Sequence, residues 1–280
     1  MHRHLIGLAS AVALSAISFA AAQADPAAPA AASSGYAIQP QAVIGGDYSY
    51  ISANHGGSAN DFGGEAGGIV PFGGGFSGQV AGGYHSIDAN HGGGTLNSYD
   101  IGGAVAWSSD MGRIGGNVAY ADVSGGGVNG SITNYGAFGE YYANDQFTLG
   151  LRGGGVTLQG SGAFGGLHGS GSTSGGYVGG EVVGYVTPDV DISGQVEYTG
   201  IKQGSQTKLG IDAEWLFSEE IPISGWVGYD YASISGGGVS ADTNTVSVGL
   251  RYYIGGNGSL VQRHRSGVDG WGSAPVTLVY

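Results

Sequence analysis

Residues 243–254 read TNTVSVGLRYYI, and the rest of the chain can be interpreted from their pattern. The large apolar residues of this stretch recur at every second position, at Val246, Val248, Leu250, Tyr252 and Ile254. Polar or small residues fill most of the positions between them. Because successive side chains of a β-strand face opposite sides of the sheet, this alternation predicts a strand with one apolar and one polar face.

The same alternation recurs along most of the chain. Short turns, such as those at 71–74 and 187–189, alternate with longer glycine-rich loops, of which 159–174 is the longest. Short connections between alternating strands indicate an antiparallel, up-and-down arrangement. We predict about twelve strands, at 42–53, 61–71, 75–88, 97–108, 112–123, 131–143, 145–158, 175–187, 189–201, 206–217, 220–235 and 243–254.

Aromatic residues distinguish a membrane barrel from a soluble sandwich, which also alternates but turns its apolar face inward. On the apolar faces, tyrosines fall near the loop ends of the strands and a second aromatic group falls near the turn ends, with Val, Ile, Leu and Gly between. Two aromatic bands around an aliphatic belt are typical of a lipid-facing barrel. The bands consist of Tyr84, Tyr99, Tyr120, Tyr135, Tyr198 and Tyr229, and of Trp107, Tyr141, Phe147 and Phe217.

The composition excludes several other classes. Glycine makes up 61 of the 280 residues, but it follows no Gly-x-y period, so the chain is not collagen-like. The regular spacing of apolar residues argues against a disordered Gly/Ser-rich chain. Charged residues are only 10% of the total, and the formal net charge of −13 makes nucleic acid an unsuitable partner. The chain has no cysteine, which is consistent with an exported protein that needs no disulfides.

The two ends of the chain differ from the stretch between them. Residues 1–24 combine a basic start, an apolar stretch and a small-x-small sequence at 22–24, which predicts a secretory signal peptide. We expect a flexible leader at 25–42, a barrel at 43–254 and a loosely ordered periplasmic tail at 255–280. This tail contains a basic cluster, QRHR at 262–265.

The run SVGLRYYI at 247–254 resembles the closing-strand signal of porin-like outer-membrane β-barrels of Gram-negative bacteria, polar-x-Gly-x-x-aromatic-x-apolar. The resemblance implies a transmembrane antiparallel barrel with short periplasmic turns, in contact with outer-membrane lipid and lipopolysaccharide. It also implies that Gly249, Tyr252 and Ile254 form the assembly signal read by the barrel-assembly machinery. In this family the signal usually ends the chain, whereas here residues 255–280 follow it.

The polar faces of the strands carry more acids than bases. Carboxylates crowded on a low-dielectric wall repel one another unless they are hydrated or paired, so a water-filled lumen and a plugged lumen with internal ion pairs are both consistent with this pattern. We predict that the lumen is lined by Asp47, Glu65, His85, Asp100, Glu140, Arg152, Glu181, Asp191, Glu197, Lys208, Asp212, Glu214, Asp230 and Arg251.

Passive diffusion of small cationic or neutral solutes is the function that these features predict. A closed structural or adhesive barrel and a lipid-modifying enzyme are the alternatives. Catalysis requires a nucleophile, a base and an orienting group within reach, and no such set stands out around His85 or the Asp212 and Glu214 pair, so we predict no enzyme and no cofactor. His55 and His91 occupy equivalent repeat positions and suggest a metal pair, but Asn-His-Gly-Gly is ordinary turn chemistry, so no metal site is predicted. The solute and the oligomeric state are left open.

Overall fold

The computed structural model describes residues 38–54, 57–90, 94–125, 128–161, 163–164, 167–168, 171–202, 204–218, 220–236, 239–256 and 258–266. The predicted signal peptide, most of the predicted leader, His55, His91 and residues 267–280 lie outside this part of the chain. Within it, no helix is long and apolar enough to cross a membrane.

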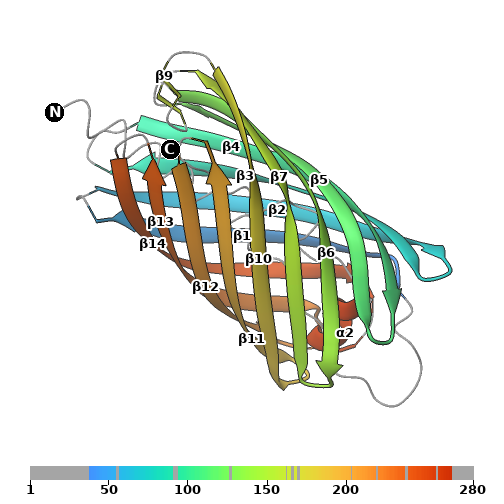
Figure 1. Cartoon of the computed structure of the whole chain (residues 1–280). Helices are drawn as coiled ribbons and strands as arrows, with labels where there is room; N and C mark the ends of the chain where they lie inside the picture. The colour runs from blue at the N-terminus through green and yellow to red at the C-terminus, as the bar shows by residue number, and fades with distance from the viewer. Residues whose placement is uncertain are drawn as a thin grey trace.

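Twelve of the described strands form one closed antiparallel barrel (Figure 1). Each strand pairs with its neighbours in sequence, and the first pairs with the last to close the sheet. The prediction of an all-β, up-and-down barrel of about twelve strands is confirmed. The strands are β1 (Gln41–Ala53), β2 (Gly57–Gly73), β3 (Phe76–Ala89), β4 (Gly94–Ser109), β5 (Gly112–Gly125), β6 (Val128–Asn144), β7 (Phe147–Ser161), β10 (Gly171–Thr187), β11 (Val190–Ile201), β12 (Gly204–Leu216), β13 (Ile223–Gly236) and β14 (Val239–Gly255).

Several strands are longer than the sequence pattern indicates. For example, β2 spans Gly57–Gly73, whereas the predicted strand covers 61–71. Ladder hydrogen bonds continue through glycine and small polar residues, which carry no apolar signal. In the longest loop, β8 (Ala163–Phe164) and β9 (Leu167–His168) form a separate two-stranded sheet that contacts β6, β7 and β10.

The two ends of the barrel differ in their connections. At the end we call the turn end, short connections join β2 to β3, β4 to β5, β6 to β7 and β10 to β11, and the barrel begins and finishes there. The opposite end, which we call the loop end, carries the glycine-rich loops. Gly74 in the first turn has a φ of 63°, a backbone conformation that favours glycine.

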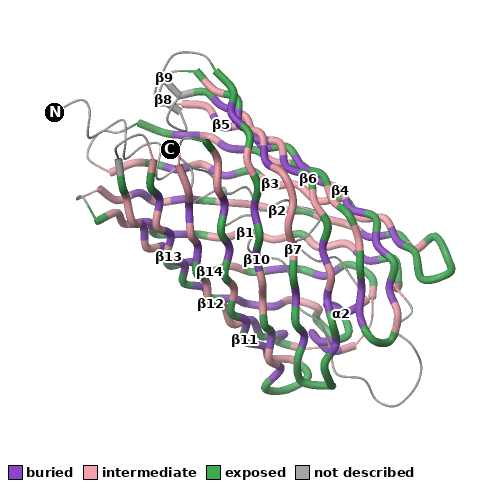
Figure 2. Tube along the Cα trace, in the orientation of Figure 1, coloured by how far each residue is buried: buried purple, intermediate pink, exposed green. Residues whose placement is uncertain are grey.

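Exposed and buried residues alternate along the strands (Figure 2). In a single closed sheet the exposed face is the outside of the barrel and the buried face is its interior. All ten aromatic residues of the two predicted bands are exposed, from Tyr120 at 37% to Tyr135 at 60%. Between the bands, the outer face carries aliphatic residues such as Val80, Val118 and Leu209.

Glycines on the inner face make room for large neighbouring side chains. A Cβ at Gly210 would lie 2.6 Å from Asp230 Oδ1, and one at Gly45 would lie 2.9 Å from Glu65 Oε1. Such distances are too short for ordinary contacts, so any side chain at these positions would displace a charged neighbour. These two inner-face glycines therefore leave room for the carboxylates that lie beside them.

The segment after β14 does not match its prediction. Residues Leu260–Ser266 form the helix α2, which lies inside the turn end of the barrel (Figure 1). Leu260 and Val261 are fully buried and pack against the inward side chains of Leu216, Val183 and Tyr185. The expectation of a loosely ordered tail does not hold for these residues. A helix this short depends on its tertiary contacts, which a sequence pattern cannot reveal.

Candidate functional site

The interior of the barrel is divided into three zones along its axis. We call them the apolar layer at the loop end, the polar belt in the middle and the helix plug, α2, at the turn end. The apolar layer consists of inward side chains that are at most 1% exposed: Ile51, Ile87, Leu96, Val123, Ile132, Leu158 and Ile234.

The sequence-based prediction gave a polar lumen and did not include the apolar layer. It continues the inward positions of the strands toward the loop end, since Ile51 follows Ser49 and Ile87 follows His85 at a spacing of two. The signal was therefore present as a change from polar to apolar residues along one face. Hydrophobic constrictions of this kind restrict the passage of water and ions.

The predicted lumen residues all lie on the inner face of the barrel. Those that the structure buries are His85, Glu140, Asp191, Glu197, Lys208, Glu214, Asp230 and Arg251. Those that it half-buries are Asp47, Glu65, Asp100, Arg152, Glu181 and Asp212. Together they form the polar belt, although their role in lining a conducting path stays a prediction.

Ion pairs join strands within the polar belt, either adjacent strands or, for Arg152 and Glu197, strands separated by β10. Arg152 Nη2 lies 2.8 Å from Glu197 Oε2, and Lys208 Nζ lies 3.1 Å from Asp230 Oδ1. Arg113 donates to both carboxylate oxygens of Glu140 at 3.0 Å. Buried charges are tolerated in this environment because most of them are paired.

Two further inward side chains, Asp61 and Arg113, also belong to the polar belt and are missing from the sequence-based prediction. Both side chains are buried, Asp61 at 0% and Arg113 at 2% exposed. Their positions alternate with outward apolar residues, Phe62 and Ile114, and this alternation could have identified them.

Acids remain in excess after this pairing. Among the residues that the structure describes, Asp47, Asp100 and Asp212 make no ion pair. These three carboxyl groups therefore have no basic partner within the described part of the interior. A wall of one sign concentrates counter-ions of the other sign.

Arg251, on the polar face of β14, connects three strands. Its Nε donates to Glu65 Oε1 on β2 at 3.0 Å, and its Nη1 donates to Glu214 on β12. Its guanidinium also lies over the Trp226 ring, 5.6 Å from the centroid. Since β14 closes the sheet, this cluster holds the first and last parts of the barrel together.

The helix plug is held by contacts to inward side chains and backbone carbonyls. Arg265 Nη2 donates to Asn144 O at 2.9 Å, and its guanidinium lies 4.4 Å from the centroid of the Tyr142 ring. Leu260 N donates to Asp189 Oδ1 at 3.3 Å, which anchors the start of α2. The basic cluster of the tail thus faces the barrel wall rather than solvent.

His264, at 0% exposed, is the most enclosed polar group of α2. Its Nε2 lies 3.3 Å from Tyr253 Oη, which itself donates to Glu214 Oε1 at 2.8 Å. Its Nδ1 lies 3.5 Å from Tyr185 Oη and 3.9 Å from Asp191 Oδ2. Burial lowers the pKa of the His264 imidazole well below its usual value, and the nearby Arg265 adds to this effect.

Acidification is expected to release α2. Because the pKa of His264 is lower in the docked helix than in a released one, the undocked state binds more protons. The contribution of neutral His264 to docking is therefore fully present above a pH of about 6.5 and is lost as the pH falls below that value. In Val261→Cys, the thiol should react with a maleimide faster at pH 5.5 than at pH 7.5, relative to an exposed reference thiol in Lys202→Cys. Adding His264→Gln should remove most of this pH dependence. If the pH dependence is unchanged in that variant, protonation of His264 does not control the docking of α2.

Solved structures provide the comparison. The NanC porin structure superposes with a TM-score of 0.56 at 13% identity, over 75% of this chain and 98% of that one. The translocator domain of the autotransporter NalP from Neisseria meningitidis superposes with a TM-score of 0.55 at 14% identity, over 77% of this chain and 88% of that one. An outer-membrane channel from Pseudomonas putida F1 superposes with a TM-score of 0.53 at 8% identity, over 82% of this chain and 99% of that one. The fold is that of a bacterial outer-membrane barrel.

No protein-family model matches the chain, and no curated protein matches it. At identities this low the likeness shows the fold alone. The exposed aliphatic belt and its aromatic bands match the outer surface expected of a barrel with this fold. The role of Gly249, Tyr252 and Ile254 as an assembly signal stays a prediction. Tyr252 and Ile254 lie on the outer face, whereas a side chain at Gly249 would collide with the inward Trp226 indole, so packing alone already favours glycine at this position.

The assignment of the two faces can be tested on adjacent residues of β5. Val118 lies at the middle of the outer face and is 56% exposed, while Asn117 is half-buried on the inner face. Val118→Arg should cost about 2–4 kcal/mol of folding free energy in a bilayer, because a charge would enter the hydrocarbon region. Asn117→Arg should cost much less. Equal losses in urea titrations of vesicle-embedded protein would refute the assignment.

Proposed function

We propose that this outer-membrane barrel is a cation-preferring channel for passive diffusion of small cationic or neutral solutes. The observation that supports this proposal best is the excess of acids in the polar belt, where Asp47, Asp100 and Asp212 lack ion-pair partners among the described residues. Unpaired carboxylates on the inner wall have no role in lipid contact. They attract cations into an interior that is otherwise insulated by the sheet and the bilayer.

Under this proposal, the arrangement of the described residues is a closed state of the channel. The apolar layer fills the interior at the loop end, and α2 fills it at the turn end. Because the two blocks lie in series, conduction requires both to open. The side chains of the apolar layer belong to the barrel wall, whereas α2 follows β14 and is not part of the sheet, so it can leave the interior as a unit.

Reversal potentials in a salt gradient test the proposal. Wild-type protein in a planar bilayer should prefer cations, and more strongly at low ionic strength, where wall charges are less screened. Replacing Asp47, Asp100 and Asp212 together by Asn should lower this preference without unfolding the barrel. The control is Asp110→Asn with Asp145→Asn, two exposed acids in the turns. An anion-selective wild type, or a triple variant with unchanged selectivity, would contradict the proposal.

A closed structural barrel is the second candidate. It is favoured by the closure of the interior at both ends. In that case, lipid-embedded protein would show no conductance steps at any voltage or pH at which the barrel is folded. An outer-membrane enzyme has no comparable support in the interior described above, where the buried His85 has its one hydrogen bond among the described residues with the carboxylate of Asp61.

A further inference from the structure

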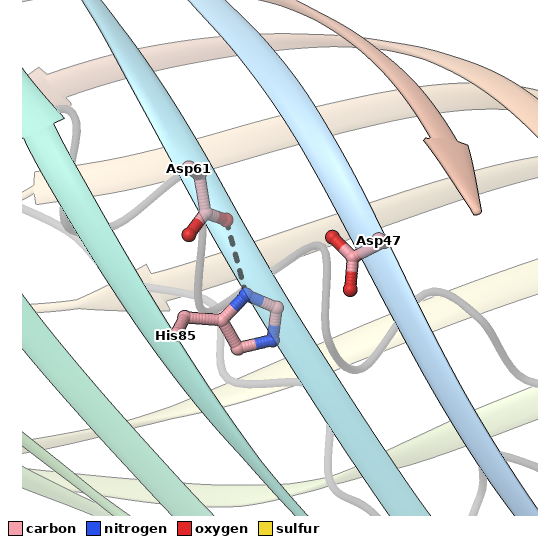
Figure 3. Close-up of side chains that lie close together, drawn as sticks. All are labelled: Asp47, Asp61 and His85. Carbon is pink, nitrogen blue, oxygen red and sulfur yellow. Dashed lines mark hydrogen bonds and ion pairs between the residues drawn. The ribbon is translucent and has the colours of Figure 1, made fainter. Parts of the chain in front are cut away.

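Three ligand-type side chains converge on the inner face next to the apolar layer. Asp47 on β1, Asp61 on β2 and His85 on β3 point toward one another (Figure 3). Each offers one ligand atom, and these atoms all lie within 4.8 Å of one another. Asp61 pairs in register with Ile87 of the apolar layer, so the cluster lies just beneath that layer.

The cluster has more negative charge than its own side chains neutralise. His85 Nδ1 lies 3.0 Å from Asp61 Oδ2, and His85 is the one base that pairs with the cluster among the described residues. Asp61 is fully buried, yet its Oδ1 has no hydrogen-bond partner, and Asp47 Oδ2 is also buried without one. Asp100 on β4 adds a further carboxylate nearby, across from Gly83. Burying unpartnered carboxylates costs free energy unless a cation compensates them.

A glycine lies between Asp47 and His85 and lets their side chains come together. A Cβ at Gly63 would lie 2.5 Å from both Asp47 Oδ1 and His85 Nδ1, and neither distance is compatible with normal packing. The residue beneath the cluster therefore cannot carry a side chain without displacing it. Gly63 therefore allows Asp47 and His85 to approach each other over the strand that lies between them.

We propose that Asp47, Asp61 and His85 bind a divalent first-row transition-metal cation of the Zn²⁺ or Mn²⁺ type. One imidazole with two carboxylates suits these ions better than Ca²⁺ or Mg²⁺, which favour oxygen ligands alone. Bonds of about 2.1 Å place tetrahedral ligands about 3.4 Å apart, so small rotations of the side chains close the observed spacing. Neutral His85 ligates the ion, and water completes its coordination. The proposal concerns binding and does not depend on whether the barrel conducts.

A second group with ligand-type residues provides a contrast. Asp191, Glu214 and His264 also lie within the same limit of 4.8 Å. However, Glu214 already accepts hydrogen bonds from Arg251, Ser224 and Tyr253. Its charge is thus compensated by protein groups, and this cluster serves to hold α2. Its histidine is therefore a suitable control for metal binding in the barrel.

The test is a Co²⁺ and Zn²⁺ titration of the full chain, refolded in detergent without a polyhistidine tag and stripped with a chelator. Visible absorption of Co²⁺ reports the ligand set, and calorimetry with Zn²⁺ gives stoichiometry and affinity. We expect one ion per chain in the barrel. His85→Asn and Asp61→Asn should each weaken metal binding by at least about tenfold. Removing a group that only hydrogen-bonds a metal ligand already lowers metal affinity by about that factor, and removing the ligand itself should cost at least as much.

Control variants separate the site from other histidines. His264→Gln and the double variant His55→Gln with His91→Gln should both retain the barrel site. If His85→Asn does not refold, Asp47→Asn provides the same test while keeping the side-chain shape. The proposal would be overturned by absence of binding, by wild-type affinity in folded His85→Asn or Asp47→Asn, or by loss of the ion only in the His55 and His91 variant.

Discussion

A chain that ends at Gly256 should conduct several-fold more current per open channel than the full chain. The truncation removes α2, whose buried residues fill the turn end of the interior, and leaves β14 complete. The full chain should show small or infrequent steps, because α2 must leave its contacts with Asn144 and Tyr142 before ions can pass.

The matched control for this truncation is a chain that ends at Ser266. It lacks residues 267–280 but keeps α2, so its conductance should resemble that of the full chain. Equal conductance of all three proteins would show that α2 does not block the path. If the chain ending at Ser266 conducted as well as the shorter truncation, the block would instead belong to residues beyond the helix.

Replacing Arg251 by Met should produce the largest loss of stability, about 3–5 kcal/mol, because it removes the positive charge that pairs with the buried Glu214 and the half-buried Glu65. Glu65 and Glu214 both pair with this guanidinium, from strands on either side of the barrel closure. Arg251→Lys should recover only part of the loss, since an ammonium group cannot donate to Glu65 and Glu214 in the two directions that the guanidinium does. Urea unfolding in lipid vesicles measures both.

Lys202→Met is the control for this substitution. Lys202 is exposed at the loop end, and its removal should change stability by less than about 0.5 kcal/mol. If Arg251→Met is no more destabilising than Lys202→Met, the Arg251 cluster does not hold the barrel closed, and its ion pairs contribute little in the bilayer.

The parts of the fold that follow from local alternation could be predicted from the sequence. The closing stretch at 243–254 shows why, since the alternation of apolar and polar residues predicts both the strand and the two sides of the sheet that its side chains face. The same reasoning placed Glu197 and Lys208 on the inner wall, and both are buried there. It also placed the aromatic residues of the two bands on the outer face.

Contacts between distant strands could not be predicted in this way. The register that brings Asp61 to His85, or Arg251 to both Glu65 and Glu214, depends on the shear of the closed barrel, which no single strand encodes. The helix α2 was missed for a different reason. Its helical state depends on burial inside the barrel, and an isolated segment of this length has too little intrinsic stability to give a signal.

Recording from a reversibly locked channel tests the central claim most directly. Val183 and Val261 belong to one buried cluster with Tyr185, and the chain has no native cysteine, so Val183→Cys with Val261→Cys is the pair to test for a single disulfide that joins α2 to the wall. Under oxidising conditions we expect almost no conductance steps. Adding a reductant to the same bilayer should restore steps with the cation preference of the unlocked protein. Steps of equal size and frequency before and after reduction, with the disulfide verified, would contradict the account of a cation channel closed by its own C-terminal helix.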